Sequence, residues 1–135
     1  MELKFALLAD HVHETKEGKL AIIGEFDTIG ALKAPARHAL CYLVARLEAS
    51  VSEGSHHKLQ VTLVDEDGKQ VLPLTPPMDV SFVPTGRGRP LRGQVILQFA
   101  SIELPRFGDY EFHLLADGRF AGAVHVRLAE IRQQT

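Results

Sequence analysis

The chain has 135 residues and a mass of 14.9 kDa, the size of one domain that can bury roughly two thirds of its unfolded surface. Apolar residues make up 45% and charged residues 24%, a globular composition that excludes a disordered or fibrous chain. The formal net charge of −2 removes the general electrostatic argument for binding to nucleic acid or an anionic membrane.

Three apolar runs come first in the chain, at positions 3–9, 20–26 and 40–47. Nearly continuous apolar runs are typical of strands that are covered on both faces, although the third run is also compatible with a short helix. The segment 27–38 carries Gly30 and Pro35 and is predicted to be a loop that can hold a helical turn.

Alternation of apolar and polar residues dominates the rest of the chain. In the segment 58–65, Leu59, Val61 and Leu63 fall on one face of a predicted strand. The same two-residue period recurs in three later segments, at residues 94–99, 110–114 and 120–128. Strands with one buried and one wet face indicate an antiparallel sheet.

Weaker extended segments lie at 70–74 and 79–83, where nearby prolines permit only an edge strand or a loop. The segment 84–93 is too rich in glycine and proline for a regular element. Short strands separated by turns at this spacing predict an all-β fold. We expect a single domain over residues 1–135, an antiparallel β-sandwich of about eight strands that is immunoglobulin-like or jelly-roll-like.

Two Asp-Gly pairs, at 67–68 and 117–118, lie between alternating segments and predict hairpins. Because paired residues share a face, three-residue loops at 66–68 and 116–118 keep the apolar residues of both strands together. The predicted pairs are Leu63 with Val71, Phe112 with Gly122, Tyr110 with Val124 and His125 with Asp109.

Several stretches resemble a family of small uncharacterised bacterial proteins known only as a domain of unknown function. They are Lys-Phe-Ala-Leu-Leu-Ala-Asp at 4–10, residues 17–27, Tyr-Leu-Val-x-Arg-Leu at 42–47, Leu-Val-Asp-Glu-Asp-Gly at 63–68 and Gly-Asp-Tyr-Glu-Phe at 108–112. The resemblance implies a bacterial origin but no activity, ligand or site residue. Separately, residues 104–110 are similar to a corner of immunoglobulin-like domains, in which a tyrosine hydroxyl, here that of Tyr110, bonds the backbone just upstream.

His11, His13, Glu17 and Gly24 have the spacing His-x-His-x3-Glu-x6-Gly, which resembles the first metal-binding motif of cupins. Two imidazoles one residue apart on a strand project to the same side, and a carboxylate beyond a turn could complete an iron, manganese or zinc site. Phe5 stands where that motif expects glycine, and a second cupin motif is missing. The competing interpretation is a polar hairpin loop over residues 10–19 with solvated histidines. His56 and His57 are likewise predicted to be loop residues.

Arg87, Arg89 and Arg92 form the one concentrated positive feature of the sequence. Mobile guanidinium groups in a glycine-rich loop could bind a phosphate or an acidic partner; the alternative is a solvated loop. No aromatic residue is interleaved with the arginines, which speaks against single-stranded nucleic acid.

The leading hypothesis is a non-enzymatic binding or assembly module that works through sheet edges or an end loop, without a cofactor or a membrane partner. Its partner would be itself or another protein, because Ile96, Ala121 and Ala123 add apolar surface to outer faces and favour a homo-oligomer. The single cysteine, Cys41, is predicted to be a buried hydrophobe and fits a reducing, cytoplasmic setting. The alternative function is a small metal-dependent cupin-like enzyme that uses His11, His13 and Glu17.

Overall fold

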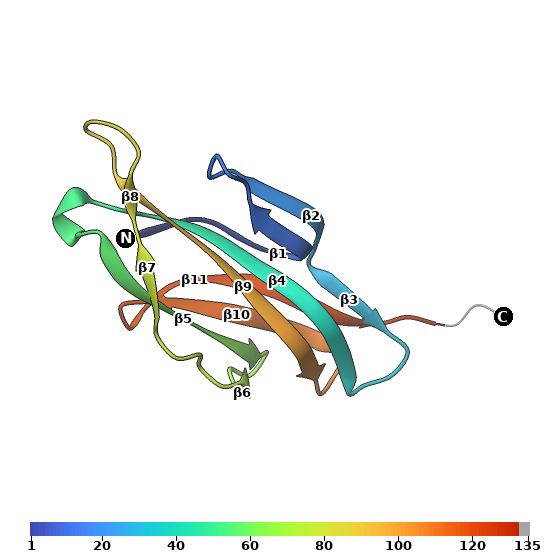
Figure 1. Ribbon diagram of the computed structural model, residues 1–135. Coiled ribbons are helices and arrows are strands. Elements are labelled where there is room, and N and C mark those ends of the chain that lie inside the picture. Colours follow the sequence, from blue (N-terminus) through green and yellow to red (C-terminus); the bar gives the residue numbers. More distant parts are fainter. Residues whose placement is uncertain (133–135) are drawn as a thin grey trace.

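The computed structural model describes residues 1–132 and is all-β apart from one short 3-10 helix (Figure 1). The elements are β1 (Glu2–Glu14), β2 (Leu20–Phe26), β3 (Thr28–Ala31), β4 (Ala36–Ala49), η1 (Val51–Glu53), β5 (His56–Asp65), β6 (Gln70–Leu72), β7 (Met78–Ser81), β8 (Val83–Pro84), β9 (Leu91–Leu104), β10 (Gly108–Ala116) and β11 (Arg119–Glu130). The predicted domain, 1–135, extends beyond this described part. Among residues 1–132, no helix is long and apolar enough to cross a membrane.

The strands form two sheets, one in the order β2-β1-β4-β9-β8 and one in the order β3-β11-β10-β5-β6, with β7 also beside β5. All of these pairs are antiparallel except β3 with β11, which is parallel. The structure thus has eleven short and long strands where the sequence predicted about eight. The segment 27–38 holds β3 in place of the expected loop with a helical turn, because backbone bonds such as Arg127 N to Asp27 O (2.8 Å) add it to the second sheet.

The main core lies between the two sheets. Phe99 of β9 meets Phe112 of β10 with ring centroids 5.2 Å apart, and Leu43, Leu63 and Leu128 are fully buried. Burying a side chain of this kind contributes about 1.5–3 kcal/mol. The alternation of apolar residues in the sequence therefore predicts most of the inner faces, although Phe120, on the predicted inner face of 120–128, is 64% exposed.

The β1–β2 hairpin folds back over the outer face of the first sheet (Figure 1). Val12 of the hairpin joins Ala9 and Val44 in a second buried cluster, against which Ile96 packs. Strand β1 runs to Glu14, so the predicted loop over 10–19 shrinks to the turn between β1 and β2. The predicted outer-face residue Ile96 is covered rather than free.

The bend in the hairpin depends on Gly24, which lies across from Asp10 in the β1–β2 register. Its φ of +71° is in the left-handed region, and a Cβ at this position would come within 2.5 Å of an Asp10 carboxylate oxygen. Only glycine accepts both conditions at little cost.

The turn between β5 and β6 has the predicted three-residue loop, because Asp65 N donates to Lys69 O at 2.9 Å. A register shift directly after it places Leu63 opposite Leu72 rather than Val71. The prediction of that loop was confirmed, and the pairing deduced from it was wrong by one residue.

The prediction of a three-residue loop at 116–118 was wrong. Ala116 pairs with Arg119, and Asp117 and Gly118 have φ of 52° and 80°, as in a two-residue type I′ turn. A bulge next to Leu114 then restores the alternation of faces. The resulting pairs are Phe112 with Val124, Tyr110 with Val126 and His125 with Glu111.

Candidate functional site

The two histidines of the proposed metal motif lie side by side on β1. His11 Nε2 is 3.1 Å from His13 Nδ1, so one imidazole donates a hydrogen bond to the other. The His11 and Tyr42 rings form a T-shaped contact. Glu17 lies in the following turn and pairs with Lys19 at 3.0 Å. In the part of the chain that the structure describes, no group of three His, Cys, Asp or Glu residues is arranged to hold a metal ion.

Arg87, Arg89 and Arg92 are exposed at the hairpin between β8 and β9. The loop is ordered by two bonds, from Arg89 N to Gly86 O (3.1 Å) and from Thr85 Oγ1 to Pro90 O (2.9 Å). Arg92 and Glu17 line the same groove of about 430 Å³ between this hairpin and the β1–β2 turn. The structure thus brings one residue of each predicted site to a shared, open and polar surface.

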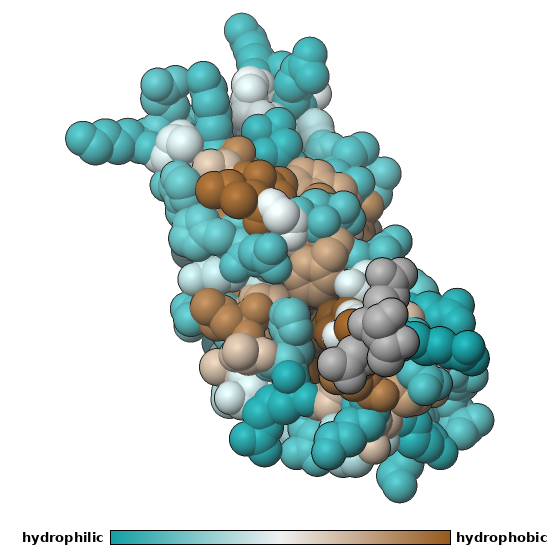
Figure 2. All heavy atoms as spheres, turned by 90° about the vertical axis from the view of Figure 1, so that its right-hand side faces the viewer, coloured by the Kyte–Doolittle hydropathy of each residue, from teal (hydrophilic) through white to brown (hydrophobic). Residues whose placement is uncertain are grey.

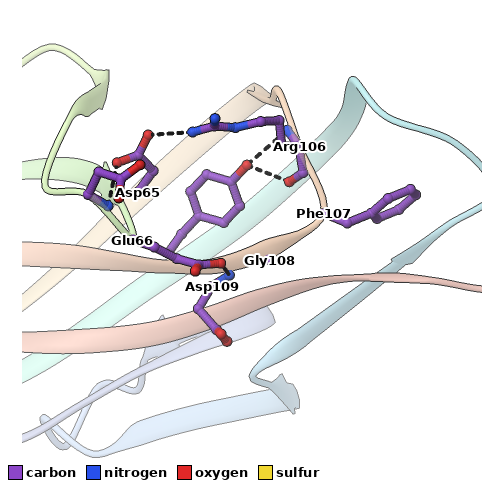
Figure 3. Close-up of a pocket in the computed structure, with 8 residues that line it drawn as sticks. Asp65, Glu66, Arg106, Phe107, Gly108 and Asp109 are labelled. Atoms are coloured by element: carbon purple, nitrogen blue, oxygen red, sulfur yellow. Dashed lines mark hydrogen bonds and ion pairs between the residues drawn. The ribbon is translucent and has the colours of Figure 1, made fainter.

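A pocket of about 220 Å³ lies where the β5–β6 turn meets the β9–β10 turn (Figure 3). The Asp65 carboxylate accepts bonds from the Lys69 and Asp67 backbone and pairs with Arg106 Nη2 at 3.0 Å. The two backbone bonds, Lys69 first, and the Arg106 charge hold the pKa of Asp65 below its ordinary value, although burial opposes them. These polar groups bond one another, so they serve to join two turns.

Tyr110 also lines this pocket and completes the junction. Its hydroxyl donates to Arg106 O and accepts a bond from Arg106 N at 3.0 Å. The predicted bond from the tyrosine hydroxyl to the backbone just upstream is therefore confirmed.

The sequence interpretation missed a buried histidine that pairs with an aspartate at the other end of the sheet. His57, on β5 rather than in a loop, is 5% exposed; its Nδ1 donates to Asp117 Oδ2 at 2.6 Å and its Nε2 to Gly54 O at 2.9 Å. Burial lowers the pKa of His57, but the bonds to Asp117 and Gly54 outweigh it and raise this pKa above the ordinary value. The signal was present, because His57 continues the inward series of Leu59 and Val61.

Cys41 lies in the core at 1% exposure, as predicted. Burial, with a smaller contribution from the Asp10 charge, raises the pKa of its thiol to about 11. Since the thiolate is the nucleophilic form, the burial and the raised pKa both disfavour reaction of this cysteine at neutral pH.

Strand β2 is the longest of the strands that end the two sheets, and its outer edge is unpaired. Strand β2 ends its sheet and is seven residues long, whereas the other edge strands have two to four residues. It carries one charge, Glu25, and no proline, and Ile22 and Ile23 are 37% and 59% exposed. On the side of the molecule where β2 and β3 lie, Figure 2 shows apolar areas between polar side chains.

Such an edge presents a row of backbone N–H and C=O groups that a strand from another chain can pair with. The other terminal strands are short, and Pro73 after β6 and Pro84 in β8 limit further backbone pairing at two of them. Ala123 adds exposed surface to the second sheet, but Ala121 packs against the core. The β2 edge is therefore the candidate site for binding.

Comparison with known proteins identifies a family. A family model described as "Family of unknown function (DUF6941)" matches residues 4–129. No curated protein matches the sequence. Among solved structures, the chain is similar to the Pseudomonas fluorescens alkylpurine DNA glycosylase AlkC bound to DNA containing an abasic site analog, at 10% sequence identity and a TM-score of 0.49. The match covers 91% of this chain and 30% of that chain.

Proposed function

Because the chain belongs to DUF6941, a family of unknown function, its role must be argued from its own residues, and we propose that it is a non-enzymatic binding or assembly module. In this proposal a partner adds a strand to the open edge of β2. The observation that carries it is the exposed, apolar, seven-residue edge around Ile22 and Ile23.

Strand addition at β2 is favourable for two physical reasons. The added strand would pair backbone groups that now face water, and its side chains would cover Ile22 and Ile23. Each Å² of apolar surface removed from water contributes about 25 cal/mol. The backbone of β2 supplies affinity for an added strand without a pocket.

The arrangement of the polar groups supports a binding role over a catalytic one. Asp65 is bonded by Arg106 and by two backbone N–H groups, and both nitrogens of His57 are bonded. These groups hold turns in place, and the pKa of Cys41, the one thiol, is raised to about 11.

Site-specific photo-crosslinking tests the proposal. A photoreactive amino acid at position 23 should crosslink, in cell extract, to one extended segment of a partner, identified by mass spectrometry. The matched control is position 120, because Phe120 is 64% exposed but lies on β11, away from the β2 edge. Equal crosslinking from both positions, or none from position 23, would contradict strand addition at β2.

A further inference from the structure

The sequence on either side of Ile22 is suited to antiparallel pairing with a second copy of itself. Lys19 stands three residues before Ile22 and Glu25 three residues after it, and every residue between them is apolar or glycine. In an antiparallel pair that is centred on one residue, positions equally far before and after the centre face each other. Two β2 strands centred on Ile22 would therefore face Lys19 with Glu25, Leu20 with Gly24, Ala21 with Ile23 and Ile22 with itself.

We propose that the protein forms a two-fold symmetric homodimer in which the β2 strands of two copies pair antiparallel about Ile22. This inference rests on the proposed function, since it names the partner of the same edge. The pairing joins two five-stranded sheets into one continuous sheet. The interface is isologous, as is usual for a dimer, because the same residues are used on both sides.

The charges favour a second copy as the partner. Glu25 has no ion-pair partner within residues 1–132, and Lys19 pairs only with Glu17, where both side chains are about three-quarters exposed. An exposed pair of this kind is weak, so Lys19 is free to turn to Glu25 of the second copy. The symmetric pairing then gains two opposite-charge contacts and brings no like charges face to face.

The apolar residues also fit this register. Ile22 and Ile23 are exposed and would be covered by the second β2. A register shifted by one residue would turn the side chains of one strand to the wrong face.

Sedimentation velocity of the full chain, over a roughly hundredfold range of concentration, tests the dimer. The charge reversal Lys19→Glu should weaken dimerisation about tenfold or more by placing two carboxylates together at each end. The double variant Lys19→Glu/Glu25→Lys should restore it, since the pair is reversed but kept. Ile22→Lys should abolish the dimer, because two lysines would meet at its centre.

Phe120→Lys is the matched control, since it adds the same charge at another exposed apolar residue and should leave the dimer intact. All four variants change exposed residues, and thermal unfolding checks that they fold. A protein that stays monomeric throughout, or a dimer that is indifferent to Lys19→Glu and Ile22→Lys, overturns self-pairing. In the crosslinking experiment, a product between position 23 and a foreign segment would leave strand addition standing while refuting the homodimer.

Discussion

Replacing Asp117 with Asn should destabilise the protein by an amount that depends on pH. The change removes the charge that His57 Nδ1 faces at 2.6 Å but keeps the turn, because Asn tolerates the φ of 52° at this position. Its amide oxygen can still accept the bond from Lys58 N that Asp117 Oδ1 accepts at 2.9 Å. The Asn amide nitrogen would then face His57 Nδ1, and because it only donates, it can bond the neutral imidazole but not the protonated one. The variant therefore removes both the charge and the acceptor that protonated His57 uses.

The structure also sets the size and the sign of this effect. A hydrogen bond to a charged group contributes about 1.5–3 kcal/mol, and since the Asp117 side chain is 49% exposed, solvent screening places the loss at about 1.5 kcal/mol. The pKa of His57 is raised above 6.5 in the folded protein. A raised pKa stabilises the protein below the unfolded value and loses that contribution as pH rises through the folded value. The loss caused by Asp117→Asn should thus be full at about pH 6 and smaller at about pH 9.

Urea unfolding followed by circular dichroism at these two pH values measures the difference. The matched control is Asp109→Asn, which breaks an ion pair with His125 of similar length, 2.7 Å, but with both side chains about half exposed. That control should change the free energy of unfolding by less than about 0.5 kcal/mol. Equal losses for Asp117→Asn at both pH values, or an equally large loss for Asp109→Asn, would refute the reasoning.

Two further predictions concern the core. Gly93→Ala should lower the free energy of unfolding by about 1–3 kcal/mol, because its Cβ would come within 2.1 Å of the buried Phe82 ring; Phe82→Leu in the same chain should relieve most of this loss in urea unfolding. Cys41 should not react with a thiol reagent at about pH 8 in the native protein, since burial raises its pKa to about 11, and should react fully in denaturant. Rapid reaction of the native protein would show that the core opens locally or that the thiol is not buried.

The local pattern of the chain predicted most of the strands. The segment 20–26 coincides with β2, and 58–65 and 120–128 lie within β5 and β11. Short elements were harder to predict from the sequence. Strand β3 has four residues, too few to establish a pattern, and it is held by pairing with β11, which comes about a hundred residues later in the chain. Four residues likewise do not indicate that β3 runs parallel to β11.

The candidate sites were less predictable than the strands. The spacing of His11 and His13 correctly placed both imidazoles on one side of a strand, where they bond each other. Alternation with Leu59 indicates that His57 points inward, but its bond to Asp117 joins β5 to the β10–β11 turn, and no local pattern reveals that partner. The contact of His125 with Asp109 was predicted and is present at 2.7 Å. It is a diagonal contact, because the residue directly opposite His125 is Glu111 and not Asp109.

By itself, the sequence determined most of the residues that lie inside and where the hairpins turn, since these depend on alternation and on turn residues within a few positions. The tertiary structure alone decided the registers, the fold-back of the β1–β2 hairpin and the choice of β2 as the open edge. A bulge shifts the register of two strands by one residue and leaves the local sequence pattern almost unchanged. Which strand lies beside which depends on packing between segments that are distant in the chain.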